Sequence, residues 1–180
     1  MGGVGNRTAV PRVSHRMIRN ATLDDLDAIV RLHTKARATY YEGHLPEDEY
    51  AGVAEVGRSR EGWAGAIERA GATVLVVEEE GGELTGVAAY SVRDGVMHLT
   101  QLHVAPERWR EGIGSALHEV CVASWRREGV AEVRLEVFVH NLRAQAFYAA
   151  RGWVEDPGLP RAGDHLTLCF VVPGASGSVD

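Results

Sequence analysis

The sequence predicts a single domain of mixed α/β class, built on a mixed sheet flanked by helices. The chain has 180 residues, about one domain's length, and its 45% hydrophobic and 24% charged residues are typical of globular domains. Strand-like and helix-like segments alternate along it. An antiparallel run of three strands precedes a strand–helix–strand order, and that order needs a crossover helix within a mixed sheet.

A strand is expected first, followed by two helical segments. Thr22 can cap the amides ahead of it, and two aspartates in the first turn suit the positive end of the helix dipole. Apolar positions then recur with helical spacing, at Leu26, Ile29, Val30 and Leu32. A second helical segment begins at Pro46 and continues from Trp63 to Ala70, with its pattern broken between Gly52 and Gly62.

Strand character dominates residues 72–104. The apolar, β-branched run 72–79 and the segment 84–92 flank Gly81-Gly82, a turn signal typical of a hairpin. A further strand is expected from Gly95 to Val104. These three strands form the antiparallel run.

The rest of the chain alternates between helix and strand. A helix is expected from about Glu111, because apolar residues recur there with helical spacing. Residues 133–139 alternate apolar and polar side chains, as a half-buried strand does. A helix over 141–151 and strands over 153–155 and 165–172 complete the order.

Composition sets the domain borders and excludes a membrane span. We expect residues 1–16 to form a flexible arm, residues 17–172 to form the domain, and residues 173–180 to form a flexible tail. The longest apolar runs are far shorter than the roughly 20 residues of a membrane-spanning helix. No membrane partner is therefore expected.

Charge and cysteine content narrow the class further. The net charge of −6 argues against a broad nucleic-acid-binding surface, which needs a basic face. Cys121 and Cys169 lie in apolar stretches, where thiols act as small hydrophobic groups, so a reducing cytoplasm is expected. The histidines form no pair with zinc-site spacing, so no metal is expected.

Gly112 and Gly114 stand at a strand-to-helix junction, where free helix amides bind anions and glycine lets phosphate oxygens approach. A tight turn without a ligand explains the same glycines. A dinucleotide fingerprint would need a third glycine where Leu117 stands, and a nucleotide P-loop would need Gly-Lys-Ser or Gly-Lys-Thr, which the chain lacks.

Two blocks resemble the GCN5-related N-acetyltransferase (GNAT) family. Val104–Leu117 is similar to its acetyl-coenzyme A loop, whose pattern is Gln or Arg, two residues, Gly, any residue, then Gly or Ala. Trp109 departs from the first anchor of that pattern. Asn141–Trp153 resembles the family's fourth helix, with Asn, Ala, Phe-Tyr, Gly and an aromatic residue at the family's spacing, and the resemblance covers Met17 to Val172.

The resemblance implies a mostly antiparallel sheet of about six to seven strands, with about four helices and with the fourth and fifth strands splayed apart. It implies acetyl-coenzyme A (acetyl-CoA) as cosubstrate. The residues it assigns to cofactor binding are Leu102, His103, Val104, Arg110, Glu111, Gly112, Ile113, Gly114, Ser115, Asn141 and Tyr148.

The same resemblance suggests catalytic roles. Tyr148 matches the tyrosine that hydrogen-bonds or protonates the coenzyme sulfur, which makes it the candidate general acid, although it could simply lie on the apolar face of its helix. His98 stands where many relatives place a glutamate base, and histidine titrates near neutral pH; a surface histidine is the simpler alternative. On a regular strand His103 points to the face opposite His98, and a bulge would change this. Asn141 is expected to cap its helix whether or not it binds ligand.

We therefore expect an N-acetyltransferase that moves acetyl from acetyl-CoA to a primary amine of a small molecule or peptide. Direct attack is expected because neither cysteine lies at the mouth of the loop. A catalytically silent coenzyme A-binding regulatory module is the alternative, and a nucleotide-dependent oxidoreductase is more distant. A homodimer is compatible with the exposed strand edges typical of the family.

Overall fold

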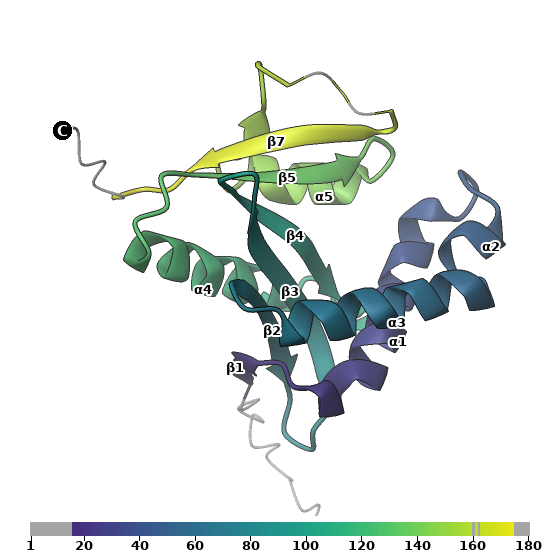
Figure 1. Ribbon diagram of the computed structural model, residues 1–180. Helices are drawn as coiled ribbons and strands as arrows, with labels where there is room; N and C mark the ends of the chain where they lie inside the picture. Colours follow the sequence, from purple (N-terminus) through teal and green to yellow (C-terminus); the bar gives the residue numbers. More distant parts are fainter. Residues whose placement is uncertain (1–15, 160, 162, 175–180) are drawn as a thin grey trace, which may run out of the picture.

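A computed structural model describes residues 16–159, 161 and 163–174 (Figure 1). Its seven strands form one sheet in the order β1-β2-β3-β4-β5-β7-β6, in which only β4 and β5 run parallel. The strands are β1 (Met17–Asn20), β2 (Ala72–Glu78), β3 (Leu84–Arg93), β4 (Val96–Val104), β5 (Glu132–Phe138), β6 (Val154–Glu155) and β7 (His165–Val171). The predicted mixed, mostly antiparallel sheet is confirmed.

Four helices of two or more turns surround the sheet, with one single-turn helix between the first two. They are α1 (Leu26–Tyr41), the single turn α2 (Glu47–Tyr50), α3 (Val53–Glu68), α4 (Ile113–Arg127) and α5 (Leu142–Ala149). None of the helices in the described part of the chain is long and apolar enough to cross a membrane.

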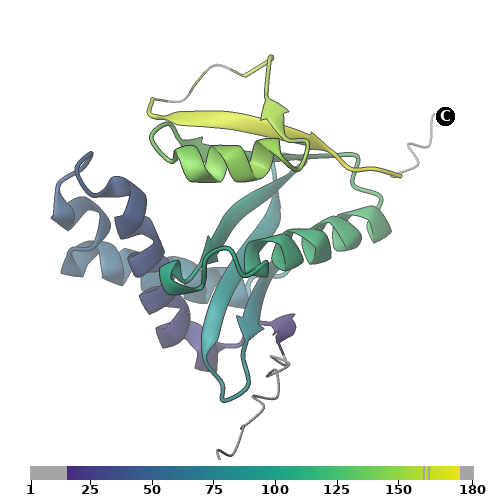
Figure 2. The ribbon, with the colours of Figure 1, turned by 180° about the vertical axis from the view of Figure 1, so that it is seen from behind.

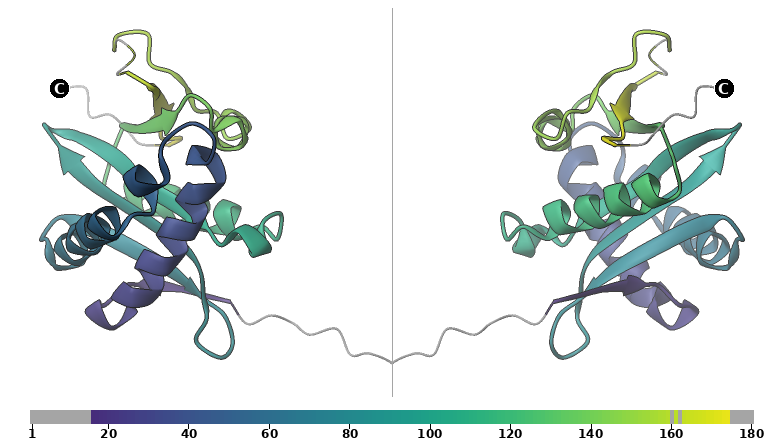
Figure 3. Two further views of the ribbon diagram at one scale, coloured as in Figure 1. Left: turned by 90° about the vertical axis from the view of Figure 1, so that its right-hand side faces the viewer. Right: turned by 90° about the vertical axis from the view of Figure 1, so that its left-hand side faces the viewer.

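The helices cover the two faces of the sheet separately, because alternate residues of β3 point to opposite sides. Val87 and Ala89 lie in a core with residues of α1 and α3, whereas Ala88 and Tyr90 lie in a larger core with residues of α4 and α5. Figure 2 shows α4 and α5 on one face, and Figure 3 shows α3 and α4 on opposite sides of the central strands.

Strands β4 and β5 separate soon after they meet. Their pairing consists of Met97 with Val133 and His98 with Arg134, although the strands are 9 and 7 residues long. Beyond these pairs β5 and β7 diverge from β4 (Figure 1). The splayed strands that the resemblance implied are therefore confirmed.

A bulge in β4 decides which side chains share a face. Leu99 pairs with Tyr90 and Gln101 pairs with Ala89, so Thr100 is an extra residue without a partner in β3. Paired residues of neighbouring strands share a face. His98, Gln101 and His103 consequently all face α1 and α3, and the opposite orientation expected for a regular strand does not apply to His98 and His103.

Helix α3 is longer and more regular than its sequence suggests. The break expected between Gly52 and Gly62 is wrong, because one continuous helix spans Val53–Glu68. Gly57, Gly62 and Gly65 each lower helix propensity. Trp63 is buried against α1 and β2, and this packing outweighs the local preference.

The expected N-terminal arm includes one described residue, Arg16, which is ion-paired to Glu79 and Glu111. The expected tail includes Pro173, whose carbonyl oxygen accepts a 2.7 Å hydrogen bond from Arg126 Nε. Residues 1–15 and 175–180 lie outside the described part of the chain.

Gly86 allows α4 to pack closely on β3. A Cβ atom at Gly86 would lie 2.8 Å from Ile113 Cγ2 and 3.0 Å from Leu117 Cδ1. We expect Gly86→Ala to destabilise the protein by about 1–3 kcal/mol through overpacking. Chemical denaturation measures the change. Gly57→Ala is the control, because its Cβ meets nothing within 4 Å in α3, and it should stabilise by about 0.5–1 kcal/mol. Equal effects of the two variants would contradict the close packing.

Candidate functional site

A cavity of about 800 Å³ occupies the opening between β4 and β5. The segment between β4 and α4 lines one end, together with the first residues of α4 and α5. Residues of α1, α3 and the β3–β4 hairpin line the other end. The splayed strands thus connect the two faces of the sheet through one cavity.

The segment between β4 and α4 has the backbone of an anion-binding loop. Arg110 and Gly112 have φ angles of +68° and +81°. Left-handed residues next to right-handed ones turn successive amides to one side, where they form an anion-binding concavity. Gly112 also caps α4, whose first amides have no partner within the helix. A Cβ atom at Gly112 would meet nothing within 4 Å, so this glycine borders open space.

Gly114 has a different role from Gly112. A Cβ atom at Gly114 would lie 3.3 Å from the ring of Phe147 and 3.5 Å from Val104. Gly114 therefore allows the first turn of α4 to approach α5 closely. The first glycine serves the loop conformation and the second serves packing.

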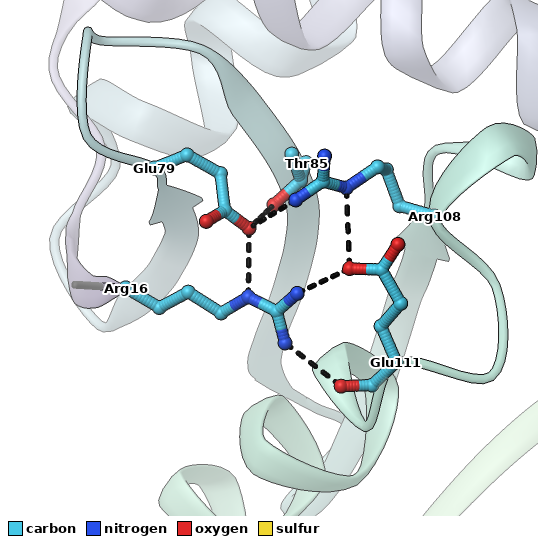
Figure 4. Close-up of polar contacts among 5 residues, drawn as sticks. All are labelled: Arg16, Glu79, Thr85, Arg108 and Glu111. Atoms are coloured by element: carbon cyan, nitrogen blue, oxygen red, sulfur yellow. Dashed lines mark hydrogen bonds and ion pairs between the residues drawn. The ribbon is translucent and has the colours of Figure 1, made fainter. Parts of the chain in front are cut away.

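Two arginines and two glutamates anchor this loop to the sheet (Figure 4). Arg16 Nε donates to Glu79 Oε1 at 2.7 Å, and Arg16 Nη1 donates to the carbonyl oxygen of Glu111 at 2.7 Å. Arg108 lies 3.3 Å from a carboxylate oxygen of each glutamate. Thr85 Oγ1 donates to Glu79 Oε1 at 3.2 Å. The charges within the cluster balance, and Glu111 is turned toward these arginines.

Trp109 ties the loop to the end of β4. Its indole Nε1 donates a 3.0 Å hydrogen bond to the carbonyl oxygen of Val104. The guanidinium of Arg143, at the start of α5, lies over the indole, with Cζ 3.0 Å from the ring centroid. The departure from the family pattern at Trp109 thus supplies a packing contact.

Tyr148 lines the cavity from α5. The helix is placed by Asn141, whose Oδ1 accepts a 3.1 Å hydrogen bond from the Ala144 amide, which confirms the predicted N-cap. The ring of Tyr148 packs against Trp153, with centroids 5.6 Å apart. Burial raises the pKa of Tyr148, so its hydroxyl keeps its proton at neutral pH.

Two histidines meet in the wall of the cavity where α1 faces β4. His33 of α1 and His103 of β4 have ring centroids 4.8 Å apart. His33 Nδ1 lies 2.8 Å from Ser59 Oγ, and His103 Nε2 lies 2.6 Å from Gln101 Oε1. Burial, reinforced by the nearby Arg37, lowers the pKa of His33 to about 4 and that of His103 well below its usual value. Both imidazoles are therefore neutral at pH 7.

His98 lines the cavity where β4 and β5 still pair. Burial lowers its pKa, and the charges of Arg93 and Arg134 lower it further. His98 is consequently neutral at pH 7 and able to accept a proton.

The end of the cavity beside α1 and α3 carries charge. Glu55 is ion-paired to both Arg37 and Arg58. Tyr41, Tyr50 and Phe138 form a separate apolar cluster next to this end, between α1, α2 and β5.

The structure brings nearly all the predicted site residues to this one cavity. Those lining it are His98, Leu102, His103, Val104, Arg110, Gly112, Ile113, Gly114, Ser115, Asn141 and Tyr148. Glu111 does not line it, because its side chain pairs with Arg16 and Arg108. In the described part of the chain, no three metal-ligating side chains gather where they could hold a metal ion.

Sequence reasoning missed several residues of the site. Arg37 and Glu55 come from helices without a recognisable motif, and Gln101 reaches the α1 side only because of the bulge. Arg16 and Glu79 contact the loop from distant parts of the chain. The only signal in the sequence was the tryptophan at position 109, where the family pattern has Gln or Arg. This departure indicated that the loop is held by a different contact.

Residues 29–153 match the family model of the acetyltransferase (GNAT) family. No curated protein matches the chain in sequence.

Solved structures share the fold at low sequence identity. The PaiA N-acetyltransferase from Thermoplasma acidophilum, in complex with coenzyme A, has a TM-score of 0.78 and 19% identity, over 87% of this chain and 98% of that one. The ribosomal-protein-S18-alanine N-acetyltransferase from Escherichia coli has a TM-score of 0.66 and 20% identity, over 87% and 94%. YncA from Salmonella typhimurium, solved with its cofactor acetyl-CoA, has a TM-score of 0.67 and 21% identity, over 88% and 95%.

Proposed function

Since the chain belongs to the acetyltransferase (GNAT) family, we propose that it transfers the acetyl group of acetyl-CoA to a primary amine of a small molecule or peptide by direct attack. One observation carries this proposal. A single cavity joins an anion-binding loop, the hydroxyl-bearing Tyr148 and the neutral imidazole of His98. Two of the structural neighbours contain coenzyme A or acetyl-CoA, which supports the same cosubstrate here.

The residues present suit acetyl-CoA. The amides of the loop between Arg110 and Gly112 would hold the diphosphate, and open space at Gly112 leaves room for its oxygens. Beyond His98, β4 has no pairing with β5, so backbone groups of Leu102 to Val104 on that edge are available to the amide-bearing pantetheine arm.

The proposed chemistry needs two proton transfers. Acetyl-CoA supplies the acetyl group as a thioester. The neutral amine nitrogen bonds to the acetyl carbon while the carbon–sulfur bond breaks. Tyr148 gives its hydroxyl proton to the departing sulfur, and an imidazole nitrogen of His98 takes the proton that the amine loses. Exchange with solvent then restores both side chains.

Selective thermal stabilisation tests acetyl-CoA binding. Acetyl-CoA should raise the Tm, and NAD and ATP should not, because a ligand stabilises the native state that binds it. Gly112→Val should reduce the rise, since valine is strained at this φ and its side chain enters the space beside the loop. Gly71→Val is the control, because Gly71 has the same φ of +81° and does not line the cavity. An unchanged Tm with acetyl-CoA would contradict the proposed function.

Tyr148→Phe tests the proton donor. We expect kcat to fall on the order of 100-fold, the scale of general acid catalysis, with the Kd for acetyl-CoA unchanged. Thiol release measures kcat, and calorimetric titration measures Kd. Tyr50→Phe is the control, because Tyr50 is buried outside the cavity. If Tyr148→Phe keeps full turnover, Tyr148 has no part in the proton transfer.

The pH profile tests His98. A base must be deprotonated to act, and the pKa of His98 is lowered, so kcat/KM, calculated on the concentration of neutral amine, should rise with pH through a pKa below 6.5 and then level off. His98→Gln should lower the plateau and remove this acid limb. A limb that persists unchanged in His98→Gln belongs to another group and excludes His98 as the base.

A further inference from the structure

We propose that the acceptor amine carries a carboxylate within a few bonds of its nitrogen, as amino acids do, and that Arg37 binds this carboxylate. The inference rests on the proposed acetyl transfer and names the class of acceptor for that same cavity.

Arg37 is held in place with donors to spare. Its side chain is 17% exposed and lines the cavity from α1. Its Nη1 atom donates to Glu55 Oε1, and Tyr40 is in hydrogen-bonding contact with the same guanidinium, which has five N–H donors and so keeps others available. Its guanidinium also lies over the ring of Tyr41, with Cζ 5.1 Å from the centroid. A fixed guanidinium with free N–H groups is suited to bind a carboxylate through two hydrogen bonds.

The local charge favours an anion. Glu55 is shared between Arg37 and Arg58, so one carboxylate balances two guanidiniums. Arg93 lines the cavity on the same side of the sheet, and Glu136 from β5 is the other carboxylate among the described lining residues. This end of the cavity is thus net positive, although the whole chain has a net charge of −6.

The pKa values of two neighbouring histidines, His33 and His103, also indicate a positive potential at this end of the cavity. Burial is the largest cause that lowers the pKa of His33, and the positive charge of Arg37 is the second. The pKa of His103 is lowered by burial first, and then by His33 and Arg37. A second ammonium group on an acceptor would meet the same repulsion. A diamine or polyamine is therefore disfavoured at this end, and a carboxylate is favoured.

Arg37 is also near the reacting groups. Tyr40 lies close enough to both Arg37 and Tyr148 for each to affect its pKa. Arg37, Tyr40 and Tyr148 also line the same cavity. A carboxylate on Arg37 would leave an amine a few bonds away inside the same cavity.

Three acceptor pools test the class. The first holds free amino acids, the second holds the same compounds with every carboxylate converted to a carboxamide, and the third holds aliphatic diamines. Thiol release from acetyl-CoA, corrected for the rate without acceptor, measures transfer. We expect the first pool to be acetylated at least tenfold faster than the second and third.

Variants of α1 test the residue. Arg37→Gln should raise the KM for the best carboxylate acceptor by about 10- to 100-fold, the scale for losing a hydrogen bond to a charged group, and leave the KM for acetyl-CoA unchanged. Arg37→Lys keeps the positive charge but loses the paired N–H donors of the guanidinium, so it should give an intermediate KM. Arg31→Gln is the control, because Arg31 is exposed on the same helix and does not line the cavity. A normal Tm rise with acetyl-CoA shows that each variant is folded.

The other outcomes separate the two proposals. Equal or faster transfer to carboxamides or diamines overturns the acceptor class, as does an unchanged KM in Arg37→Gln. If no pool is acetylated while acetyl-CoA raises the Tm, the carboxylate class is wrong, and the result supports coenzyme binding alone. If acetyl-CoA does not raise the Tm of the unaltered protein, the proposed function itself fails.

Discussion

The brief pairing of β4 with β5 is the constraint on which the rest of the site depends. Two residue pairs join the strands, and the antiparallel pairs β3–β4 and β5–β7 keep both strands in one sheet. The facing backbone edges beyond His98 therefore remain without strand partners. Backbone polar groups need hydrogen bonds, so such an edge is suited to a ligand with amide groups. The cavity follows from an interrupted ladder between two well-supported half-sheets.

Residues that are distant in sequence hold the loop at one end of this cavity against the sheet. Gly86 lets α4 lie close to β3, and the neighbouring Thr85 joins the cluster that includes Glu79 and Arg108. Trp109 holds the loop to Val104 on its other side. These contacts fix the left-handed backbone at Arg110, which a residue with a side chain rarely adopts. Because these ion pairs balance their own charge, the loop amides are the groups that we propose to bind the diphosphate.

The two ends of the cavity are electrostatically different from the middle. Loop amides and the α4 N-terminus form one positive end, and Arg37 with Arg58 forms the other. The same cavity is lined by imidazoles that burial keeps neutral and by a tyrosine that burial keeps protonated. Such an arrangement suits the proposed chemistry, in which an anionic group would lie at each end and uncharged proton donors and acceptors would lie near the thioester and the amine.

The sequence by itself determined the fold class, the strand order along the chain and the region of the loop. Periodicity and glycine placement are local signals. Predictions made from them agree with the structure because each segment buries its own apolar face. The Asn141 cap is local in the same sense. Local signals failed for α3, where the burial of Trp63 outweighs three glycines, and for the face of His103, where a bulge at Thr100 reverses the alternation. Only the tertiary structure decided the charged end of the cavity, because Arg37, Glu55 and Arg58 come from α1 and α3 and meet through packing that no short stretch of sequence encodes.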